Sequence, residues 1–376
     1  MDLCNKLYKS IYKEIFNYNI IYYIIMNKVE LQDTIRKICA PGKGILAADE
    51  STGTLAKRFA SIKLENTHAN RIAYRDLLFT TPNLDKYISG VITYEETLFD
   101  KSSDNILLIQ PLIDADIVVG IKVDMGVKPL YGTDDETVTQ GLDDLDVRCK
   151  KYYKAGARFA KWRAVLKVDV EKHLPSDLAV HENAVTLARY ASICQNNGLV
   201  PIVEPEILMD GTHTSIQARD ATINVLSVVY RELLRHHVDM SCTLLKPNMV
   251  RPGVSSSEKL DCAKLAEHTI FAFQHTIPVN MPGVVFLSGG MSEVEATMAL
   301  NVINKYDATK PWRLTFSYGR ALQASVLDTW KGNLENKNAA QEMLFKRAEA
   351  NGLASNGKYV NELIDNHSLH EKDYVY

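Results

Sequence analysis

Eight short apolar runs that alternate with segments of helical periodicity predict an α/β protein, a (β/α)8 barrel of the TIM type. The chain has 376 residues, which suits one large barrel domain, because such barrels often exceed about 250 residues. No Gly-x-Gly-x-x-Gly motif follows the first run. The rival architecture, a doubly wound open sheet, therefore lacks its best sequence support.

The expected strands are short and rich in aliphatic or aromatic residues. In chain order they span residues 44–48, 90–94, 117–123, 158–162, 200–203, 243–245, 284–287 and 314–316. Helical periodicity is clearest over residues 177–197, 215–236, 292–304 and 321–350, and several of these segments begin at Ser or Asp caps. We expect the barrel to occupy residues 26–352, followed by a mobile C-terminal tail over residues 353–376 that contains few aliphatic residues.

The first 25 residues differ from the rest, being rich in Ile, Tyr, Asn and Lys. We interpret residues 1–25 as a disordered extension, or as the result of a mis-called start with Met26 as the true first residue. A helix packed on the body and a targeting segment are the alternatives. Polar residues interrupt the apolar stretch and no small-residue cleavage site follows it, which disfavours targeting.

The overall composition excludes several classes of function. With 43 Lys and Arg against 46 Asp and Glu, the net charge is -3, so a nucleic-acid binder is disfavoured and any anion must meet local basic groups. No apolar run approaches the ~18 residues of a transmembrane helix. The six cysteines form no Cys-x-x-Cys pair and no Cys/His set at metal spacing. We therefore expect a cytoplasmic protein with no metal site and no membrane contact.

A lysine ends the sixth apolar run, within Cys242-Thr243-Leu244-Leu245-Lys246-Pro247-Asn248. A lysine at the last inward position of a buried strand lies in a medium of low dielectric, which disfavours the ammonium form and leaves a nucleophilic amine. Schiff-base enzymes need such an amine. The alternative is a lysine whose stem lies along the strand end while its head reaches solvent.

Charged residues collect at the ends of five predicted strands, where barrel active sites lie. They are Asp49 after the first run, Lys122 and Asp124 at the third, Lys161 and Arg163 at the fourth, Glu204 and Glu206 after the fifth, and Lys246 after the sixth. Three of these sets are i, i+2 pairs, whose members lie on the same side of a strand. Mutual pairing of these cations and carboxylates at one mouth favours acid and base chemistry over solvated structure.

Two further clusters indicate phosphate binding. Ser288-Gly289-Gly290 and Ser317-Tyr318-Gly319-Arg320 follow the seventh and eighth runs, where barrels of this type commonly bind phosphate. Ser51, Thr54 and Lys57-Arg58 follow the first run. Ordinary turns and a capped helix with a solvated basic face are the alternatives. Together the clusters predict a ligand with a phosphate at each end.

These motifs resemble class I fructose-bisphosphate aldolases. The matching stretches are residues 41–53, 159–163, 201–206, 244–248 and 316–323, which occur in the family's order. The similarity runs from about residue 28 to 359 and includes the terminal Tyr376. The resemblance implies a (β/α)8 fold, a homotetramer, and binding to actin or other acidic segments.

The resemblance also implies roles for individual residues. Lys246 would form the Schiff base, Glu204 would act as general acid and base with Glu206 and Lys161 beside it, Asp49 would assist carbon–carbon cleavage, and Tyr376 would act in product release. The ketose and its C1 phosphate would be held by Arg58, Ser288, Gly289, Gly290, Ser317, Gly319 and Arg320; the far phosphate by Ser51, Thr54, Lys122 and Arg163; and Arg71 corresponds to a position linked to substrate binding.

The implied reaction is the reversible cleavage of fructose 1,6-bisphosphate to dihydroxyacetone phosphate and glyceraldehyde 3-phosphate, in glycolysis and gluconeogenesis, with no metal and no cofactor. One alternative is another Schiff-base aldolase such as a transaldolase, for which one phosphate site would suffice. The other is a catalytically silent or dual-use protein that presents its basic mouth to acidic segments. Intact Lys246, Glu204 and Asp49 disfavour the silent form.

The chain departs from the family pattern at a few positions. Ser241-Cys242 replace Glu-Gly before the lysine strand, Met125 replaces a lysine, and Met291 replaces a glutamine. Ser241-Cys242 lie at the start of their strand, far from the lysine amine, so we expect the chemistry to be retained. The loss of a cation at Met125 is expected to weaken the far phosphate site.

Overall fold

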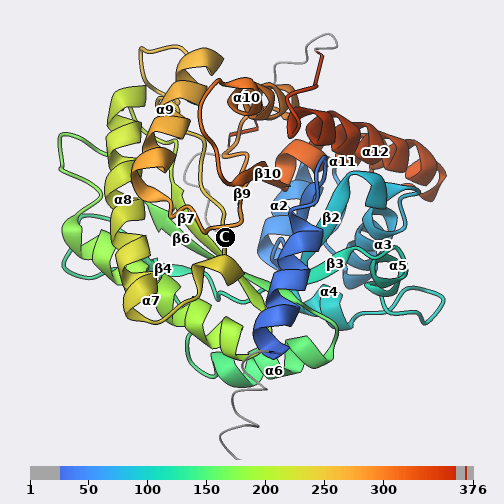
Figure 1. Cartoon of the computed structure of the whole chain (residues 1–376). Coiled ribbons are helices and arrows are strands. Elements are labelled where there is room, and N and C mark those ends of the chain that lie inside the picture. Colours follow the sequence, from blue (N-terminus) through green and yellow to red (C-terminus); the bar gives the residue numbers. More distant parts are fainter. Residues whose placement is uncertain (1–25, 361–368, 371–376) are drawn as a thin grey trace, which may run out of the picture.

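The computed structural model describes residues 26–360 and 369–370 (Figure 1). Eight parallel strands close into a barrel in the order β1-β10-β9-β8-β7-β6-β3-β2, and helices surround it (Figure 1). The barrel strands are β1 (Gly44–Ala48), β2 (Ile88–Thr93), β3 (Val118–Lys122), β6 (Phe159–Leu166), β7 (Val200–Ile207), β8 (Leu244–Leu245), β9 (Gly283–Phe286) and β10 (Arg313–Tyr318). The predicted (β/α)8 fold is confirmed.

The strands are apolar throughout because both of their faces are buried. All five residues of β1 and all eight of β7 are buried, for example. Between strands and helices lies one large apolar cluster, and a second cluster fills the barrel interior. In the second cluster, Leu31, Ile35 and Ile38 of the helical residues 26–38 pack against inward-facing strand residues. This helix therefore closes the end of the barrel opposite the carboxyl ends of the strands.

A phenylalanine fills the closed end of the barrel. The Phe159 ring lies so near Gly120 that a Cβ built on that glycine would be 2.2 Å from it. Any larger residue at position 120 would displace the ring. This end of the barrel is thus tightly packed, and the buried charged groups described below gather at the opposite end.

Several of the helices begin at capping residues, as the sequence indicated. Those described are α2 (Thr52–Ser61), α3 (His68–Phe79), α4 (Glu95–Phe99), α5 (Gln110–Asp114), α6 (Leu145–Lys154), α7 (Asp177–Asn196), α8 (Ser215–Arg235), α9 (Cys262–Thr276), α10 (Glu293–Lys305), α11 (Arg320–Trp330) and α12 (Lys337–Ala354), with the short 3-10 turns η1 (Leu84–Lys86), η2 (Met240–Cys242) and η3 (Leu334–Asn336). Thr214 and Ser292 open α8 and α10 with complete capping boxes. None of the helices in the described part of the chain has the length and apolar character needed to cross a membrane.

The predicted continuous helical segment 321–350 is wrong, because the structure breaks it in two. α11 ends at Trp330, and Lys331 and Gly332 adopt positive φ angles of 51° and 76°. A left-handed residue cannot continue a right-handed helix. α12 then turns back and packs against α11, α10 and α3 on the outside of the barrel (Figure 1).

Two features near the barrel mouth were not expected from the sequence. β6 and β7 extend three or more residues beyond the predicted runs, to Leu166 and Ile207. A two-stranded antiparallel hairpin, β4 (Val127–Pro129) with β5 (Thr137–Thr139), follows β3. The Thr139 hydroxyl donates to the Arg163 carbonyl oxygen at 2.7 Å, which fastens the hairpin to β6. The longer strands and the hairpin therefore surround the charged residues at the barrel mouth.

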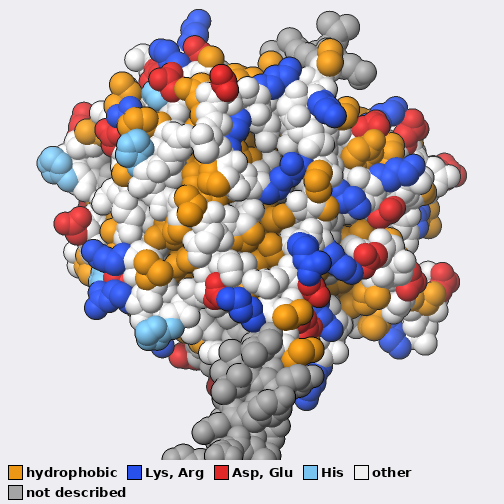
Figure 2. Space-filling model, viewed as in Figure 1, with side chains coloured by type: hydrophobic (Ala, Val, Ile, Leu, Met, Phe, Trp, Pro, Cys, Tyr) orange, Lys and Arg blue, Asp and Glu red, His pale blue; other side chains and the backbone are white. Residues whose placement is uncertain are grey.

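The predicted N-terminal extension, residues 1–25, and Tyr376 lie outside the described residues. α12 continues to Ala354, two residues beyond the predicted end of the barrel at residue 352. Leu369 and His370 lie at the barrel mouth, where the His370 imidazole Nε2 is 3.2 Å from Asp210 Oδ1. On the face seen in Figure 2, basic and acidic side chains are interspersed around hydrophobic ones, so no single-sign field covers this face.

Candidate active site

The lysine that ends β8 lies inside the barrel mouth beside a carboxylate. Register places β8 next to β7, with Leu244 and Leu245 opposite Ile202 and Val203, and the Lys246 amide donates to the Val203 carbonyl at 2.8 Å. This brings the Lys246 Nζ within 3.2 Å of Glu204 Oε1. Both side chains are about nineteen-twentieths buried, with 6% and 5% exposed. The solvated alternative for Lys246 is therefore wrong.

A second lysine links three carboxylates. The Lys161 Nζ on β6 lies 2.8 Å from Asp49 Oδ2, 3.6 Å from Glu204 Oε2 and 3.8 Å from Asp124 Oδ2. These groups come from the ends of β1, β7 and β3, which the closed barrel brings together. Alternating cations and carboxylates keep the cluster near neutral, which is what permits so many charges in a buried site.

The cation–carboxylate pairs extend on both sides of this cluster. Lys122 Nζ is 2.7 Å from Asp124 Oδ1 and donates to the Asp124 carbonyl oxygen at 2.8 Å. Arg163 donates to Glu206 Oε2. Each i, i+2 set therefore has both members near the mouth, as the strand period predicted. Burial raises the pKa of the Glu206 carboxyl, but the Arg163 guanidinium more than offsets this and the pKa is lowered.

The charge network also sets the ionisation of Asp49. Burial by itself raises the pKa of its carboxyl. The positive charges of Lys161, Lys246 and Lys122 lower the pKa by more than burial raises it, to about 2 from the ordinary 3.8. The same balance applies to Asp124. Burial raises the pKa of its carboxyl, but the charges of Lys122 and Lys161 outweigh burial, so the pKa is lowered. Both carboxyls are anionic at neutral pH and act as hydrogen-bond acceptors there.

Acid should weaken the fold through Asp49. Because its folded-state pKa lies below the unfolded value, its stabilisation is complete above about pH 4 and is lost as the pH falls toward about 2, amounting to about 2 kcal/mol. Urea unfolding of native protein and Asp49→Asn, measured at several pH values across this range, checks the prediction. The variant should lose less unfolding free energy across the range. Equal losses in both proteins would contradict the assignment.

These charges open into one cavity, with a free volume of about 40 Å³. Its lining residues are Ala47, Asp49, Glu50, Arg58, Lys161, Glu204, Glu206, Lys246, Leu287, Ser288, Gly289, Ser317, Gly319 and Arg320. The turns after β9 and β10 thus meet the lysine and its carboxylate, as predicted. Ser317 is 1% exposed, and its hydroxyl oxygen has no hydrogen-bond partner among the described residues. A buried hydroxyl of this kind favours a polar ligand in the cavity.

Several predicted residues lie outside this cavity lining. Ser51 caps α2, where its hydroxyl accepts from the Thr54 amide at 3.3 Å and lies 3.1 Å from the Thr54 hydroxyl. Lys122 and Arg163 are held by the carboxylates described above. Gly290, with φ of 82°, faces His370, whose Cα lies 2.9 Å from where a Cβ would be. These residues lie at the edge of the mouth and do not line the cavity together with the turns after β9 and β10.

Glu50 lines the cavity, and the sequence analysis gave it no role. It follows Asp49 by one residue, so it points to the other side of the chain and accepts from Arg58 and from Arg75 of α3. The only sequence signal was its place directly after the first strand. Arg320 also has an unexpected partner, because its guanidinium donates to the Leu369 carbonyl oxygen.

The departures from the family pattern lie away from the reacting groups. Met125 is 60% exposed and Met291 is buried. Ser241 and Cys242 lie in η2, before β8, and the Ser241 hydroxyl donates to Asp239 Oδ1 at 2.7 Å. Nothing in the described contacts connects these four residues with Lys246, and the Met291 amide donates to the carbonyl oxygen of Ser288, a residue that lines the cavity, at 3.0 Å.

A set of candidate metal ligands lies elsewhere. His68, Glu96 and Asp100 place ligand atoms within 4.8 Å of one another, the single such group found among the described residues. Arg71 occupies the Glu96 carboxylate with two hydrogen bonds, of 2.8 and 2.7 Å. This ion pair competes with a cation for the same oxygens.

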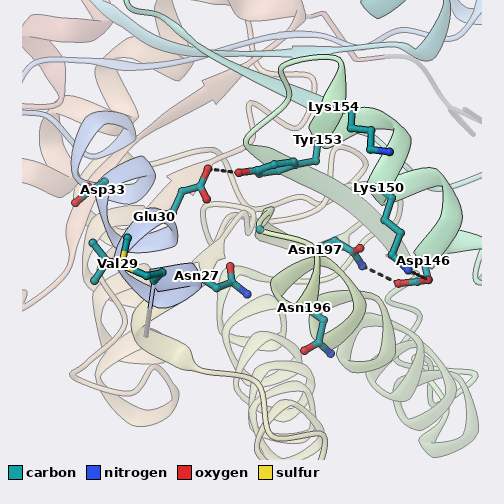
Figure 3. A pocket seen from close by; sticks show the side chains of 12 residues that line it. Asn27, Val29, Glu30, Asp33, Asp146, Lys150, Tyr153, Lys154, Asn196 and Asn197 are labelled. Atoms are coloured by element: carbon teal, nitrogen blue, oxygen red, sulfur yellow. Dashed lines mark hydrogen bonds and ion pairs between the residues drawn. The ribbon is translucent and has the colours of Figure 1, made fainter. Parts of the chain in front are cut away.

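A larger cavity, of about 670 Å³, lies between residues 26–33, α6 and the turn after α7 (Figure 3). Across it, the Tyr153 hydroxyl donates to Glu30 Oε1, and the Asn197 amide donates to Asp146 Oδ1 at 3.0 Å. None of the predicted site residues lines it. The buried cation–carboxylate network therefore marks the barrel mouth, despite its smaller volume, as the candidate active site.

Comparison with known proteins gives one consistent result. A family model described as glycolytic fructose-bisphosphate aldolase class-I matches residues 30–376. The cytosolic fructose-bisphosphate aldolase 4 of Arabidopsis thaliana is 54% identical over 358 residues, covering 94% of this chain and 91% of that protein. The fructose-bisphosphate aldolase of Dictyostelium discoideum is 54% identical over 351 residues, covering 92% and 98%.

A solved structure agrees with the sequence relatives. It is a ternary co-crystal structure of the Plasmodium falciparum fructose-bisphosphate aldolase in complex with TRAP and a small-molecule inhibitor. It superposes with a TM-score of 0.88 at 54% identity and covers 89% of this chain and 96% of that one. Sequence and fold thus point to the same set of relatives.

Proposed function

Because this chain belongs to the class I fructose-bisphosphate aldolase family, we propose that Lys246 forms a Schiff base with the substrate while Glu204 and Asp49 assist it. The chain is a carbon–carbon lyase that reversibly cleaves fructose 1,6-bisphosphate to dihydroxyacetone phosphate and glyceraldehyde 3-phosphate. The observation that carries the residue assignment is the 3.2 Å approach of Lys246 Nζ to Glu204 Oε1 inside a buried cavity.

In the first stage, the Lys246 amine attacks the C2 carbonyl of the ketose. Glu204 first takes a proton from the Lys246 ammonium group, which frees the amine for attack. A second proton then moves from the bonded nitrogen to the C2 oxygen, and Glu204 returns its own proton to the resulting C2 hydroxyl, which leaves as water. The product is an iminium bonded to Lys246. The Lys161 Nζ lies 3.6 Å from the other Glu204 oxygen and helps to hold the Glu204 side chain in place.

In the second stage, the bond between C3 and C4 breaks and its electron pair moves into the iminium. In class I enzymes this iminium takes the place of a metal ion as the electron sink. Asp49 supports the step by accepting the proton of the C4 hydroxyl, so that C4 becomes the aldehyde carbon, while Lys161 lies 2.8 Å from its carboxylate. Glu206 is proposed to act beside Glu204 through its pairing with Arg163.

The phosphate at C1 is assigned to the turns after β9 and β10. Ser288, Gly289, Ser317, Gly319 and Arg320 line the cavity next to Lys246, and Arg58 faces them. The unpartnered Ser317 hydroxyl offers one donor. Arg320 would exchange the Leu369 carbonyl for a phosphate oxygen, a stronger charge-assisted partner. Ser51, Thr54, Lys122 and Arg163 are proposed for the far phosphate, with Gly290 bordering the first.

The remaining proposals concern features of the protein that the described residues do not test. The domain limits 1–25, 26–352 and 353–376 rest on composition and periodicity, and the cytoplasmic location rests on the scattered cysteines. The homotetramer and a role of Tyr376 in product release rest on the family resemblance. Support for the location comes from relatives named as cytosolic. Binding of actin or other acidic segments is supported in kind by the Plasmodium falciparum aldolase, which was solved in complex with TRAP.

Borohydride trapping tests the proposed nucleophile. Protein incubated with dihydroxyacetone phosphate and reduced should gain the mass of one reduced adduct, on the peptide that contains Lys246. Because the electron sink is the iminium, EDTA should change neither the adduct nor the cleavage rate. Absence of the adduct from folded protein, or its mapping to another lysine, would refute the assignment. Loss of cleavage with EDTA would refute the metal-free mechanism.

A further inference from the structure

The turn after β9 contains two glycines with left-handed backbone angles. Gly289 and Gly290 have φ angles of 55° and 82°, which residues with a Cβ adopt only at a cost in energy. Because glycines have no side chains, they cannot fasten the turn themselves, and its position depends on what packs against it. Ser288 and Gly289 line the cavity beside Lys246, so the position of the turn also sets where their polar groups lie.

A methionine from two strands away packs against both glycines. Met209 lies in the loop after β7 and is 6% exposed. Its Sδ is 3.1 Å from the position of a Cβ built on Gly289, and its Cε is 3.3 Å from that of a Cβ built on Gly290. The remaining nearest contacts of the two positions come from Leu287, Asn248 and His370. Among these nearest described contacts, Met209 alone is shared by both glycines.

The backbone around Met209 is anchored to the segment after β8. The Met209 carbonyl oxygen accepts a hydrogen bond from the Val254 amide at 2.8 Å. Two residues earlier, the Ile207 amide donates to Asn248 Oδ1 at 2.6 Å. Both partners belong to the segment that follows β8, so Met209 joins the loops after three neighbouring strands. Its side chain therefore reaches the turn from a base that is itself held in place.

Met209 acts on the cavity only through the turn. It does not line the cavity, and its thioether has no hydrogen-bond donor to offer a ligand. Shortening the side chain would leave a void against Gly289 and Gly290, and a turn that contains two glycines can shift into such a void. A shift of about 1 Å in a group that binds the substrate is enough to weaken binding severalfold or more.

We propose that Met209 is a positioning residue for the substrate phosphate. By filling the space against Gly289 and Gly290, it holds the turn where Ser288 and the glycine amides meet the phosphate. Met209 thus affects how strongly the protein prefers a phosphorylated ketone to the same ketone without phosphate. This inference rests on the proposed function, because it assumes that the C1 phosphate binds at this turn.

The test measures half-saturation by dihydroxyacetone phosphate and by dihydroxyacetone, each taken from the fraction of Lys246 trapped by borohydride at a series of concentrations. In Met209→Ala, the half-saturation concentration of dihydroxyacetone phosphate should rise about tenfold, because the turn loses its support. That of dihydroxyacetone, which lacks the phosphate, should not change. Met209→Leu keeps the apolar volume and should stay close to native for both ketones.

Met209→Val gives a second reading that does not depend on the folding of Met209→Ala. It shortens the side chain less, so it should give a smaller rise, again for the phosphorylated ketone alone. A purely structural role predicts lower thermal stability, with half-saturation for the two ketones either unchanged or shifted by the same factor. Either of those results in a folded variant would overturn the proposal.

A matched control makes the same change at the other end of β9. Met281 is 1% exposed and lies two residues before β9 begins at Gly283. Met281→Ala should lower thermal stability and leave both titrations unchanged. Selective weakening of dihydroxyacetone phosphate in Met281→Ala as well would also overturn the proposal. The absence of any Lys246 adduct in the native protein would refute the proposed function, whereas a native adduct with an unchanged Met209→Ala titration would refute only this inference.

Discussion

Lys246→Met is expected to lower the rate of fructose 1,6-bisphosphate cleavage by at least about 10⁴-fold, because no other group can then form the covalent intermediate. Methionine is similar in length and lacks the amine, and the side chain it replaces is 6% exposed. The fold should persist, since Glu204 keeps Lys161 at 3.6 Å as a cationic partner. Lys161 also lines the cavity, so peptide mapping of any residual borohydride adduct shows whether its amine replaces that of Lys246. Steady-state cleavage rates, with circular dichroism for the fold, check this result.

The matched control removes a lysine whose ion pair lies on the outer helices. Lys337→Met breaks the 2.7 Å pair with Asp76 and should retain the native cleavage rate. If Lys246→Met kept substantial activity, the assignment of the nucleophile would fail. If Lys337→Met lost activity to the same degree, the effect of the first variant would reflect damage to the fold.

Glu204→Gln is expected to reduce kcat by about 10²- to 10⁴-fold, the usual contribution of a general acid and base. The amide can still donate a hydrogen bond, but it cannot take the proton from the Lys246 nitrogen, 3.2 Å away in the native structure. The substitution also leaves Lys161 and Lys246 without the carboxylate between them. We therefore expect a larger effect on kcat than on KM, and slower formation of the borohydride-trapped adduct.

Glu232→Gln provides the same chemical change at another buried glutamate. Glu232 is 2% exposed and pairs with Arg231 and Arg235 at the end of α8, and none of these three residues lines the cavity at the mouth. Thermal unfolding measures the stability of this variant, which should cleave fructose 1,6-bisphosphate at the native rate. Unaltered adduct formation in Glu204→Gln would show that another group transfers these protons.

The sequence predicted most of the barrel because its signals are local. An apolar run bounded by turn residues makes a strand wherever it is buried on both faces, and β1 over residues 44–48 matches the prediction residue for residue. The break after Trp330 was missed because the helical periodicity continues on both sides of it. Residues 331–336 separate the two helices; they begin with the positive φ angles of Lys331 and Gly332 and include η3. The β4–β5 hairpin was missed because three-residue strands carry too little periodicity to detect.

For the site, the sequence predicted which residues lie at the strand ends, but it did not predict which charged groups they pair with. Position in the strand placed Lys161, Glu204 and Lys246 at the mouth, because residues at the carboxyl ends of barrel strands point to one opening. Which carboxylate each lysine meets depends on strand register and side-chain reach. Glu50 and Arg75 show the limit, since they are 25 residues apart on a loop and a helix, and no spacing rule connects them.

The sequence by itself determined the fold class, the eight strands, the nucleophile candidate and the family, because each depends on residue type and short-range order. The tertiary structure decided which charges neutralise one another: Lys161 with Asp49, Arg163 with Glu206, and Glu50 between Arg58 and Arg75. The physical reason is that electrostatic energy depends on distance and burial in three dimensions. Barrel closure sets both quantities for groups that are distant along the chain.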